Sequence, residues 1–331
     1  MAQVGTVLDL VGARRDGEVV ELVRSITRED GLAAAVALLA EVQREVGRRW
    51  QHRQFSVADE HAATAVVDLA LSAVALEAGP RRTAAVGGVV VVACAEEEWH
   101  VMPARMFAEQ LRAAGREVVF LGASTPAAHL QRFLAADPPV ALALSCTVPL
   151  YLPGARRAVS ASHAAGVPVL AGGAAFGTSA LRAVAIGADS WAPTPGSAAA
   201  ALAGWARSRP ALVVPAVGEA DALALGAVRT ALVKRAMRAL TARVPAVAGY
   251  TPWQLAKTRE DLDYIIRFVE ASLLTADDSI VTDFAGWLAS VLAARGLPDG
   301  IVALGAGVLR DCLPEGFGEA DRLLKVMMAP G

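Results

Sequence analysis

The sequence predicts a multidomain α and α/β protein, in which a doubly wound, five-stranded parallel sheet lies between two helical domains. Two observations predict it: apolar residues recur at helical spacing near both ends of the chain, and short β-branched runs alternate with helical segments between them. The 331 residues suffice for two or three domains, and 55% of them are hydrophobic. We therefore expect a helical bundle at residues 1–80, an α/β domain at 83–209 and an all-helical domain at 218–331.

The N-terminal residues have the spacing of a small bundle of short helices. Apolar side chains recur every three or four residues in two stretches, Leu32, Val36, Leu39, Val42 and Val46, then Ala62, Val66, Leu69 and Ala73. Ser56, followed by Asp59 and Glu60, has the pattern of a capping box that opens the helix of the second stretch. We therefore predict helices joined by tight turns.

The middle of the chain alternates between strand and helix patterns. A continuous β-branched run at residues 89–93 is typical of a strand buried on both faces. Further strands are expected at residues 118–121, 140–145, 167–171 and 190–192, with helices at 103–114, 127–135, 155–165, 178–186 and 196–207. This alternation predicts a doubly wound parallel sheet, in which ligands bind at the carboxyl ends of the strands.

The C-terminal residues are predicted to be helical, beyond a linker at residues 210–218 that is rich in Pro, Val and Gly. Residues 229–240 have an amphipathic pattern. Thr251 before Pro252 is typical of a helix start, and that helix extends to about residue 274. Asp278 is expected to cap the next helix, which ends at Gly296, and two more helices follow near 300–313 and 318–327.

The composition excludes several classes of partner. The chain has 33 acids and 31 Lys plus Arg, so its bulk charge does not favour nucleic acid. The longest apolar run, residues 84–95, is too short to span a bilayer, and the first 15 residues lack the apolar core of a signal peptide. Its three cysteines form no CxxC pair, which indicates a reducing cytoplasm without disulfides or a zinc site.

A polar loop with a histidine follows the first predicted strand. Glu98 precedes His100 by two residues, so its carboxylate can reach the imidazole and fix its tautomer. A neutral imidazole at the carboxyl end of a strand is a suitable ligand for a transition metal. The alternative is a solvated loop histidine with no ligand.

The segment Glu98-Trp99-His100-Val101-Met102-Pro103 resembles the D/E-x-H-x-x-G signature of cobalamin-binding domains, which have a flavodoxin-like sheet. The resemblance implies that His100 displaces the nucleotide base of cobalamin and ligates cobalt from below, while Glu98 hydrogen-bonds His100. Trp99 lies inside the signature and is taken as a cofactor-binding position. Pro103 stands where the signature has glycine, although proline suits the first turn of a helix.

Two later strand ends complete the resemblance. Ser145-Cys146-Thr147 closes the third strand, where the family places a serine near the displaced benzimidazole, so Ser145 and Thr147 are expected to contact the cofactor. Gly172 and Gly173 follow the fourth strand, where paired glycines let the nucleotide tail lie against the backbone.

The N-terminal bundle has a second motif. Trp50, followed ten residues later by Glu60 and His61, resembles the cap of CarH-type photoreceptors, which hold adenosylcobalamin in the dark. The resemblance implies that Trp50 packs on the upper ligand and that Glu60 and His61 contact its adenosyl group. The alternative is a bundle-core tryptophan beside a surface helix start. Where those proteins have a histidine after the tryptophan, this chain has Gln51, so the light-state cobalt ligand is left open; no DNA-binding domain is expected.

The C-terminal domain has no histidine, which makes it a poor haem domain. Its size suits a globin-like fold, and its position resembles that of the biliverdin-binding domain of photocobilins, cobalamin photoreceptors with a globin-like domain. A bilin needs an apolar slot and cations for its propionates. The candidates are Trp253, Tyr264, Phe268, Phe284 and Trp287, with Lys234, Arg235, Arg238, Lys257, Arg259 and Arg267. The alternative is a helical signalling or dimerisation domain.

Three functions are compatible with these motifs. The first is a light sensor, not an enzyme, in which light breaks the cobalt–carbon bond, the cap moves, and an unidentified signalling partner receives the change. The second is a corrinoid methyl carrier that works with a separate methyltransferase, and the third is cobalamin storage or delivery. An isomerase is disfavoured because the chain has no large barrel. Alanine-rich helices are compatible with a homodimer.

Overall fold

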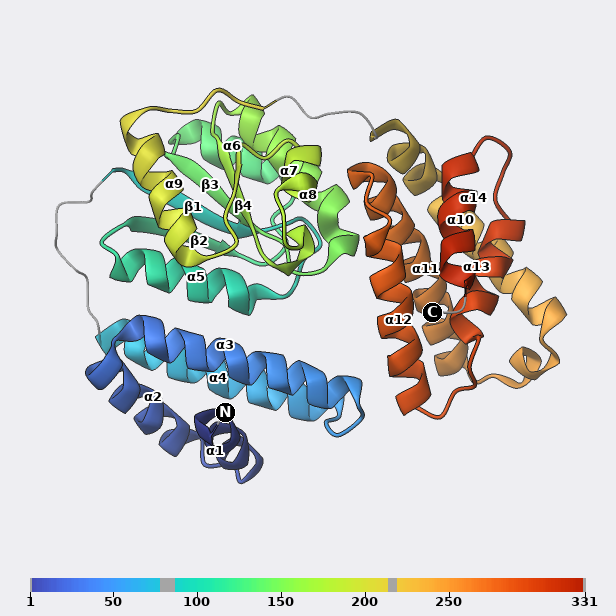
Figure 1. The fold of residues 1–331 in the computed structure, drawn as a ribbon, viewed down its shortest axis with the longest axis horizontal. Helices are drawn as coiled ribbons and strands as arrows, with labels where there is room; N and C mark the ends of the chain where they lie inside the picture. The colour runs from blue at the N-terminus through green and yellow to red at the C-terminus, as the bar shows by residue number, and fades with distance from the viewer. Residues whose placement is uncertain (1, 78–86, 214–218, 330–331) are drawn as a thin grey trace.

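The computed structural model describes residues 2–77, 87–213 and 219–329. Helices make up the N-terminal and C-terminal parts, and a five-stranded parallel sheet lies between them in the sequence (Figure 1), which confirms the predicted fold class. Residues 214–218 of the expected linker and the expected boundary near residue 80 lie outside the described residues. In the described parts, no helix is both long and apolar enough to cross a bilayer.

The N-terminal helices form a bundle, as the apolar spacing predicted, and this bundle (residues 2–77) is called the cap below. They are α1 (Ala2–Gly12), α2 (Asp16–Asp30), α3 (Leu32–Gln51) and α4 (Val57–Glu77), and they enclose a core of their own. The capping box is confirmed, because the amide of Asp59 donates to Ser56 Oγ at 3.2 Å and the amide of Ser56 donates to Asp59 Oδ2 at 3.0 Å.

The strands are β1 (Val89–Cys94), β2 (Glu117–Gly122), β3 (Ala141–Ser145), β4 (Val169–Gly172) and β5 (Ser190–Trp191). They lie in the order β2-β1-β3-β4-β5, and every neighbouring pair is parallel. The strand order reverses between β1 and β3, which is the switch point where such sheets bind ligands. In the register, Cys94 pairs with Ser145, and Ser145 pairs with Gly172. Three strand ends therefore meet at one edge.

Helices cover both faces of the sheet. Packed on one face are α5 (Val101–Ala113) and α9 (Pro195–Arg207). On the other face lie α6 (Ala127–Ala136), α7 (Leu152–Ala164) and α8 (Leu181–Ala185), with short 3-10 turns η1 (Pro149–Tyr151) and η2 (Ala174–Phe176). Helix α5 also supplies Met102 and Met106 to the core of the cap, so one helix is shared by the sheet and the cap.

The C-terminal helices are α10 (Glu219–Arg243), α11 (Pro252–Thr275), α12 (Ser279–Ala294), α13 (Ile301–Asp311) and α14 (Gly318–Met328), with the 3-10 turn η3 (Pro245–Gly249). Helix α10 is twice as long as the amphipathic stretch at 229–240 suggested. The N-cap at Thr251 is confirmed, and Gln254 completes it as a capping box, which was not predicted. Asp278 occupies the N-cap position of α12 as predicted, but its side chain makes no capping hydrogen bond and pairs with Arg322 instead.

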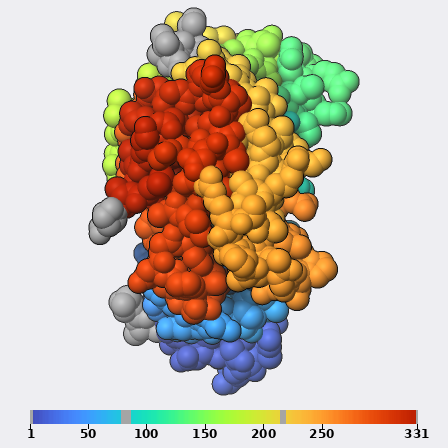
Figure 2. All heavy atoms as spheres, turned by 90° about the vertical axis from the view of Figure 1, so that its right-hand side faces the viewer, coloured from blue at the N-terminus to red at the C-terminus, as the bar shows by residue number. Residues whose placement is uncertain are grey.

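The C-terminal domain lies against both of the other parts (Figures 1 and 2). Arg182 pairs with Asp277 at 2.8 Å, which joins α8 to the turn between α11 and α12. Arg156 of α7 pairs with Glu219 of α10 at 3.0 Å. On the cap side, α3 and α12 are in contact. The switch point of the sheet, the cap and the C-terminal domain are thus neighbours.

Candidate functional site

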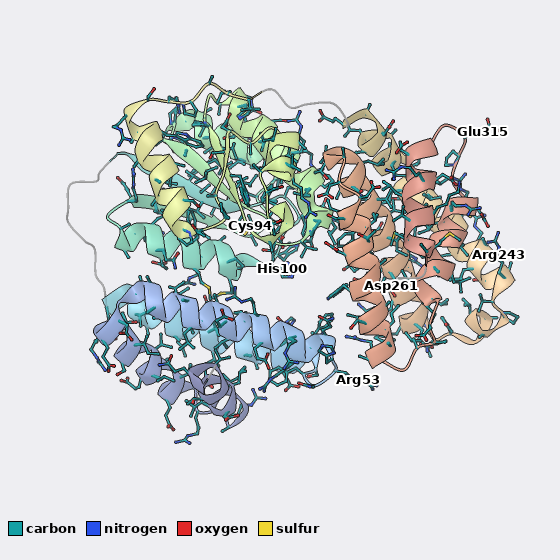
Figure 3. All side chains as sticks on the ribbon, viewed as in Figure 1. Arg53, Cys94, His100, Arg243, Asp261 and Glu315 are labelled. Carbon is teal, nitrogen blue, oxygen red and sulfur yellow. The ribbon has the colours of Figure 1, made fainter. Side chains whose placement is uncertain are left out.

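The loop from Ala95 to His100 leaves β1 at the switch point and leads into α5. The amide of Ala95 donates to the carbonyl of Ser145 at 2.8 Å, and the amide of Glu98 donates back to Ala95 at 3.0 Å. The chain therefore turns tightly directly after the strand. Figure 3 shows His100 at the sheet edge that faces the cap and the C-terminal domain.

Glu98 is fully buried, with 0% of its side chain exposed. Its Oε1 accepts hydrogen bonds from His100 Nδ1 at 2.5 Å and from the His100 amide at 2.9 Å. Its Oε2 accepts from the amides of Thr147 at 2.9 Å and Val148 at 3.2 Å. Burial raises the pKa of this carboxyl, but the hydrogen bonds from His100 and Thr147 outweigh it and lower the pKa overall. The buried carboxylate is therefore ionised and fully hydrogen-bonded.

His100 is oriented by Glu98 and remains accessible, with 55% of its side chain exposed. The hydrogen bond to Glu98 raises the pKa of the imidazole, burial opposes this, and the charge of Glu60 on α4 adds to the increase. Because Nδ1 is held by Glu98, Nε2 is the nitrogen left to bind a metal, and no hydrogen bond within the described residues engages it.

The chemistry of the donors fits a metal that brings its own ring of ligands. Among the residues that the structure describes, no three His, Cys, Asp or Glu side chains are grouped to hold a bare ion. A bare structural metal usually takes four protein ligands, whereas a macrocyclic metal such as haem iron needs one axial histidine. His100 with Glu98 behind it suits the second case.

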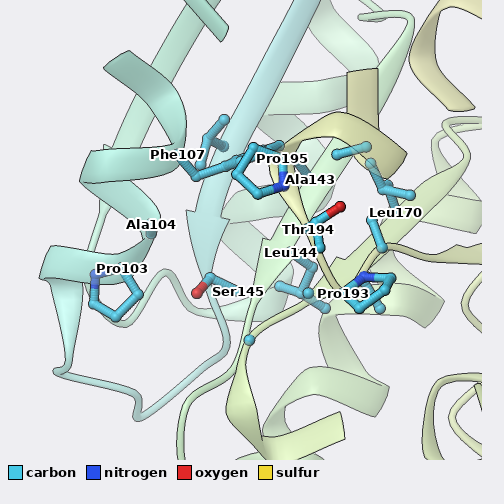
Figure 4. A pocket seen from close by; sticks show the side chains of 16 residues that line it. Pro103, Ala104, Phe107, Ala143, Leu144, Ser145, Leu170, Pro193, Thr194 and Pro195 are labelled. Atoms are coloured by element: carbon cyan, nitrogen blue, oxygen red, sulfur yellow. The ribbon is translucent and has the colours of Figure 1, made fainter. Parts of the chain in front are cut away.

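A pocket of about 170 Å³ opens beside this loop, between α5, α9 and the ends of β3, β4 and β5 (Figure 4). The predicted residues Ser145, Gly172 and Gly173 line it. The rest of the lining is mostly apolar, with Thr194 as its second hydroxyl group. A largely apolar pocket with a few hydroxyl groups suits a flat aromatic base with a polar tail.

Gly172 and Gly173 are glycines for different structural reasons. Gly173 has φ of +105°, and a Cβ there would collide with the carbonyl oxygen of Cys146, so the backbone itself requires glycine. A Cβ at Gly172 would lie 3.4 Å from the Ala192 carbonyl, an ordinary contact. Gly172 therefore keeps the pocket open without being needed for the fold.

The other predicted residues near the loop play different parts. Thr147 fixes Glu98 through its amide, and its buried hydroxyl group has no hydrogen-bond partner among the described residues. Trp99 is exposed and does not line the pocket. Cys94 is buried as predicted, and burial together with the charge of Glu98 raises the pKa of its thiol to about 12, so it is inert.

The cap residues lie at the end of α3 and the start of α4. Trp50 stacks on Trp287 of α12, with ring centroids 6.3 Å apart and an angle of 24° between the rings, and Arg295 lies 5.0 Å above the Trp50 ring. Gln51 donates to Ser290 Oγ at 3.2 Å. These partners were missed by sequence reasoning, because nothing in the local pattern indicates a contact across 239 residues.

Glu60 and His61 form an ion pair with each other at 2.7 Å, and the His61 side chain is exposed. The charge of Glu60 acts on His100 from the cap side, whereas His52 ends α3 as an exposed residue. The structure therefore brings Glu60 toward His100 and places Trp50 against the C-terminal domain. The contacts of these residues with an adenosyl group stay a prediction.

Comparison with known proteins agrees with the geometry of the site. Two family models match, both described as a B12 binding domain: one over residues 88–203, which contain the sheet, and a second over residues 7–75, which contain the cap. None of the curated proteins compared matches the chain.

Three solved structures are similar to this chain, and the first shows a shared fold. The monomethylamine corrinoid protein of Methanosarcina barkeri is 17% identical, with a TM-score of 0.50 over 60% of this chain and 95% of that one. A cobalamin-binding protein from Desulfitobacterium hafniense DCB-2 is 19% identical, with a TM-score of 0.33 over 61% and 98%. The methanol:cobalamin methyltransferase complex MtaBC of Methanosarcina barkeri is 18% identical, with a TM-score of 0.32 over 60% and 78%. The chain carries both B12 binding domains and is a cobalamin-binding protein.

Proposed function

We propose that the chain is a light sensor that holds adenosylcobalamin with its base displaced and with His100 as the lower cobalt ligand. One observation carries the proposal. The cap helix end that bears Trp50 contacts the C-terminal domain through Trp287, while Glu60 on the next cap helix acts on His100. The cap is thus in contact with the C-terminal domain on one side and close to the cobalt ligand on the other.

The lower side of the site holds the cofactor. Glu98 keeps Nδ1 of His100 engaged, so that Nε2 would be the nitrogen that binds cobalt when the cofactor is present. Ser145, Gly172 and Gly173 line the pocket that would receive the displaced base and its tail. Thr147 acts through the hydrogen bond from its amide to Glu98, and Trp99, exposed between Glu98 and His100 in the sequence, would contact the cofactor from outside this pocket.

The upper side of the site would report on the light. When bound, adenosylcobalamin supplies a cobalt–carbon bond that visible light cleaves. Trp50, Glu60 and His61 would contact the adenosyl group in the dark and lose that contact afterwards. Because Trp50 already stacks on Trp287, a shift of the cap would change the contact with the C-terminal domain. Gln51, held by Ser290, stands where a second histidine ligand would be needed.

For the C-terminal domain we propose a globin-like, biliverdin-binding role. Its support is the absence of histidine from this domain together with its aromatic side chains, among them Trp287 beside Phe284, and its cations. Phe268 and Phe284 stack on each other at 3.7 Å, so they fill core space and do not form a slot. A homodimer and a downstream signalling protein complete the proposal.

The test is illumination of the reconstituted chain. Full-length protein is loaded in the dark with adenosylcobalamin, with hydroxocobalamin as the matched control, and separately with biliverdin. We expect green light to change the absorption spectrum and the small-angle scattering of the adenosylcobalamin sample only, and biliverdin to give a red-absorbing complex. If the absorption spectrum of the adenosylcobalamin sample stays unchanged under green light, the proposal of light sensing is wrong. Light scattering of the same samples tests the dimer.

A second candidate is a corrinoid methyl carrier. It is favoured by the fold that the chain shares with a monomethylamine corrinoid protein, of which the match covers 95%. The same residues would hold the cofactor, with His100 below. The discriminating measurement loads the chain with methylcobalamin in the dark and follows methyl transfer to a thiol acceptor in the presence of a methyltransferase. Turnover there, with no response to light, would favour the carrier.

A further inference from the structure

Three successive acids in the loop after β1 have partners in three different places. Glu96 pairs with Arg157 of α7 at 2.5 Å, and Glu98 is turned inward to His100. Glu97 pairs with Arg267 of α11 at 2.6 Å, across 170 residues of sequence, and its other carboxylate oxygen lies 3.6 Å from Arg157 of α7. Through Glu97, the loop that carries His100 is tied to the C-terminal domain.

Arg267 has a second contact that also leads to His100. Its guanidinium lies 5.2 Å from the centroid of the Tyr151 ring, and the Tyr151 ring lies 6.4 Å from that of His100 at an angle of 56°. Only 15% of the Arg267 side chain is exposed. A cation held between a carboxylate and an aromatic face, and largely out of water, orients both groups.

The backbone of Glu97 shows why the loop needs such a contact. Its φ is +71°, in the left-handed region that side chains other than glycine rarely adopt. Its amide donates to Ser124 Oγ at 3.1 Å, and its carboxylate is held by Arg267. An unfavoured conformation of this kind persists only where surrounding contacts hold it. The next residue is Glu98, so a change at Glu97 is passed directly to the group that orients His100.

We propose that Arg267 of the C-terminal domain is a positioning residue for the cobalt ligand His100, acting through Glu97 and Tyr151. The inference rests on His100 as the ligand and does not depend on light. It makes the C-terminal domain part of the cobalamin site, beyond any role as a separate output domain. Docking of α11 and ligation by His100 would then favour each other.

The experiment measures ligation directly on the full chain. Hydroxocobalamin is bound and reduced to the cobalt(II) state, and electron paramagnetic resonance reports the splitting by an axial imidazole nitrogen. We expect Arg267→Ala and Glu97→Gln to reduce the fraction with this splitting and to raise the dissociation constant about tenfold, as for outer-shell partners of other metal ligands. Arg267→Lys, which keeps the charge, should recover part of the loss.

The matched control is Arg156→Ala. It removes another ion pair between the C-terminal domain and the sheet, to Glu219, without touching the loop, and it should leave the splitting unchanged. In the apoprotein, amide hydrogen exchange at residues 95–100 should speed up in Arg267→Ala and not in Arg156→Ala.

Three results would overturn the proposal. Arg267→Ala and Glu97→Gln could both retain the wild-type splitting and affinity. Arg156→Ala could lose as much as Arg267→Ala, which would indicate general docking in place of positioning. His100→Ala could keep the nitrogen splitting, in which case there is no ligand at His100 to position. A wild-type chain that ligates cobalt through His100 but ignores light would contradict light sensing alone.

Discussion

The loop below the proposed cobalt position and the cap end above it are held in different ways. The loop is held by hydrogen bonds to a carboxylate that is 0% exposed, and all of those donors lie within the sheet domain. The cap end at Trp50 is held by a ring stack, a cation over the ring and one hydrogen bond, all to the C-terminal domain. The comparison indicates that the loop is a rigid element that binds the cofactor, whereas the contacts of the cap end can be exchanged for others.

The typical free energies of these interactions support this difference between the loop and the cap end. A hydrogen bond to a buried charge contributes roughly 1.5–3 kcal/mol, and losing one partner leaves the others unsatisfied. An aromatic pair contributes about 0.5–1.5 kcal/mol beyond its buried area, and it can be replaced by another apolar contact. We therefore expect a change at Glu98 to weaken cobalamin binding strongly, and changes at the cap end to alter how the domains respond.

The largest effect is expected at Glu98. Glu98→Gln keeps the size but replaces an acceptor oxygen by a donor, which leaves buried amide groups facing another donor. We expect the free energy of unfolding of the apoprotein to fall by about 2–4 kcal/mol and the affinity for hydroxocobalamin to fall about a hundredfold. Urea denaturation measures the free energy of unfolding, and spectral titration measures the affinity for hydroxocobalamin. Glu96→Gln, in the same loop, is the control and should cost under about 1 kcal/mol; equal losses in both variants would contradict the comparison.

The next effect concerns the pocket beside the loop. Gly172→Leu should fold normally, since a Cβ there meets only an ordinary contact, but its side chain would fill the pocket that Ser145 and Thr194 line. We expect affinity for cobalamin to fall about tenfold or more. Binding of cobinamide, which lacks the nucleotide tail, should not change. Equal losses for both ligands would show that the pocket does not receive the tail.

A smaller effect is expected at the cap contact. Trp287→Ala removes the ring on which Trp50 stacks, at a cost of about 1 kcal/mol to the contact between the cap and the C-terminal domain. Affinity for hydroxocobalamin should stay within about threefold, while small-angle scattering should show a more open molecule. Trp253→Ala, which removes an exposed tryptophan at the start of α11, is the control. A large loss of affinity in Trp287→Ala would mean that the upper side also holds the cofactor.

The smallest effect is a pH dependence at Asp261 of α11. Burial and, after it, the nearby negative charge of Glu260 raise the pKa of this carboxyl from its ordinary value of 3.8 to about 6. The folded state therefore prefers the protonated acid, so stability falls as pH rises from about 4 to about 6 and stays lower above that. Asp261→Asn should remove this dependence and stabilise the protein at pH 7 by less than about 1 kcal/mol, because solvent screens the charge of this partly exposed carboxyl. Urea denaturation at pH 4 and pH 7 measures it, and a variant no more stable than wild type at pH 7 would refute it.

Much of the fold could be predicted from local patterns. Strand and helix alternate at short spacing, so the ends of β1, β3 and β4 were located within a few residues, and with them His100, Ser145 and Gly172. Thr194 was missed as a pocket residue because its approach to Ser145 depends on the pairing of β3, β4 and β5, which no local pattern reports. Asp278 was placed correctly at the N-cap of α12, but the side chain that accepts from the Ser279 amide is that of Asp277, one residue earlier.

The amino-acid sequence alone was enough to predict the order of the elements and a cobalamin cofactor, since both depend on residues a few positions apart. It placed Glu98 beside His100 for the same reason. Two contacts could be identified only in the folded chain. Glu97 pairs with Arg267, and Trp50 stacks on Trp287. Those pairs come from different domains, and the docking of surfaces distributed over the whole chain brings them together.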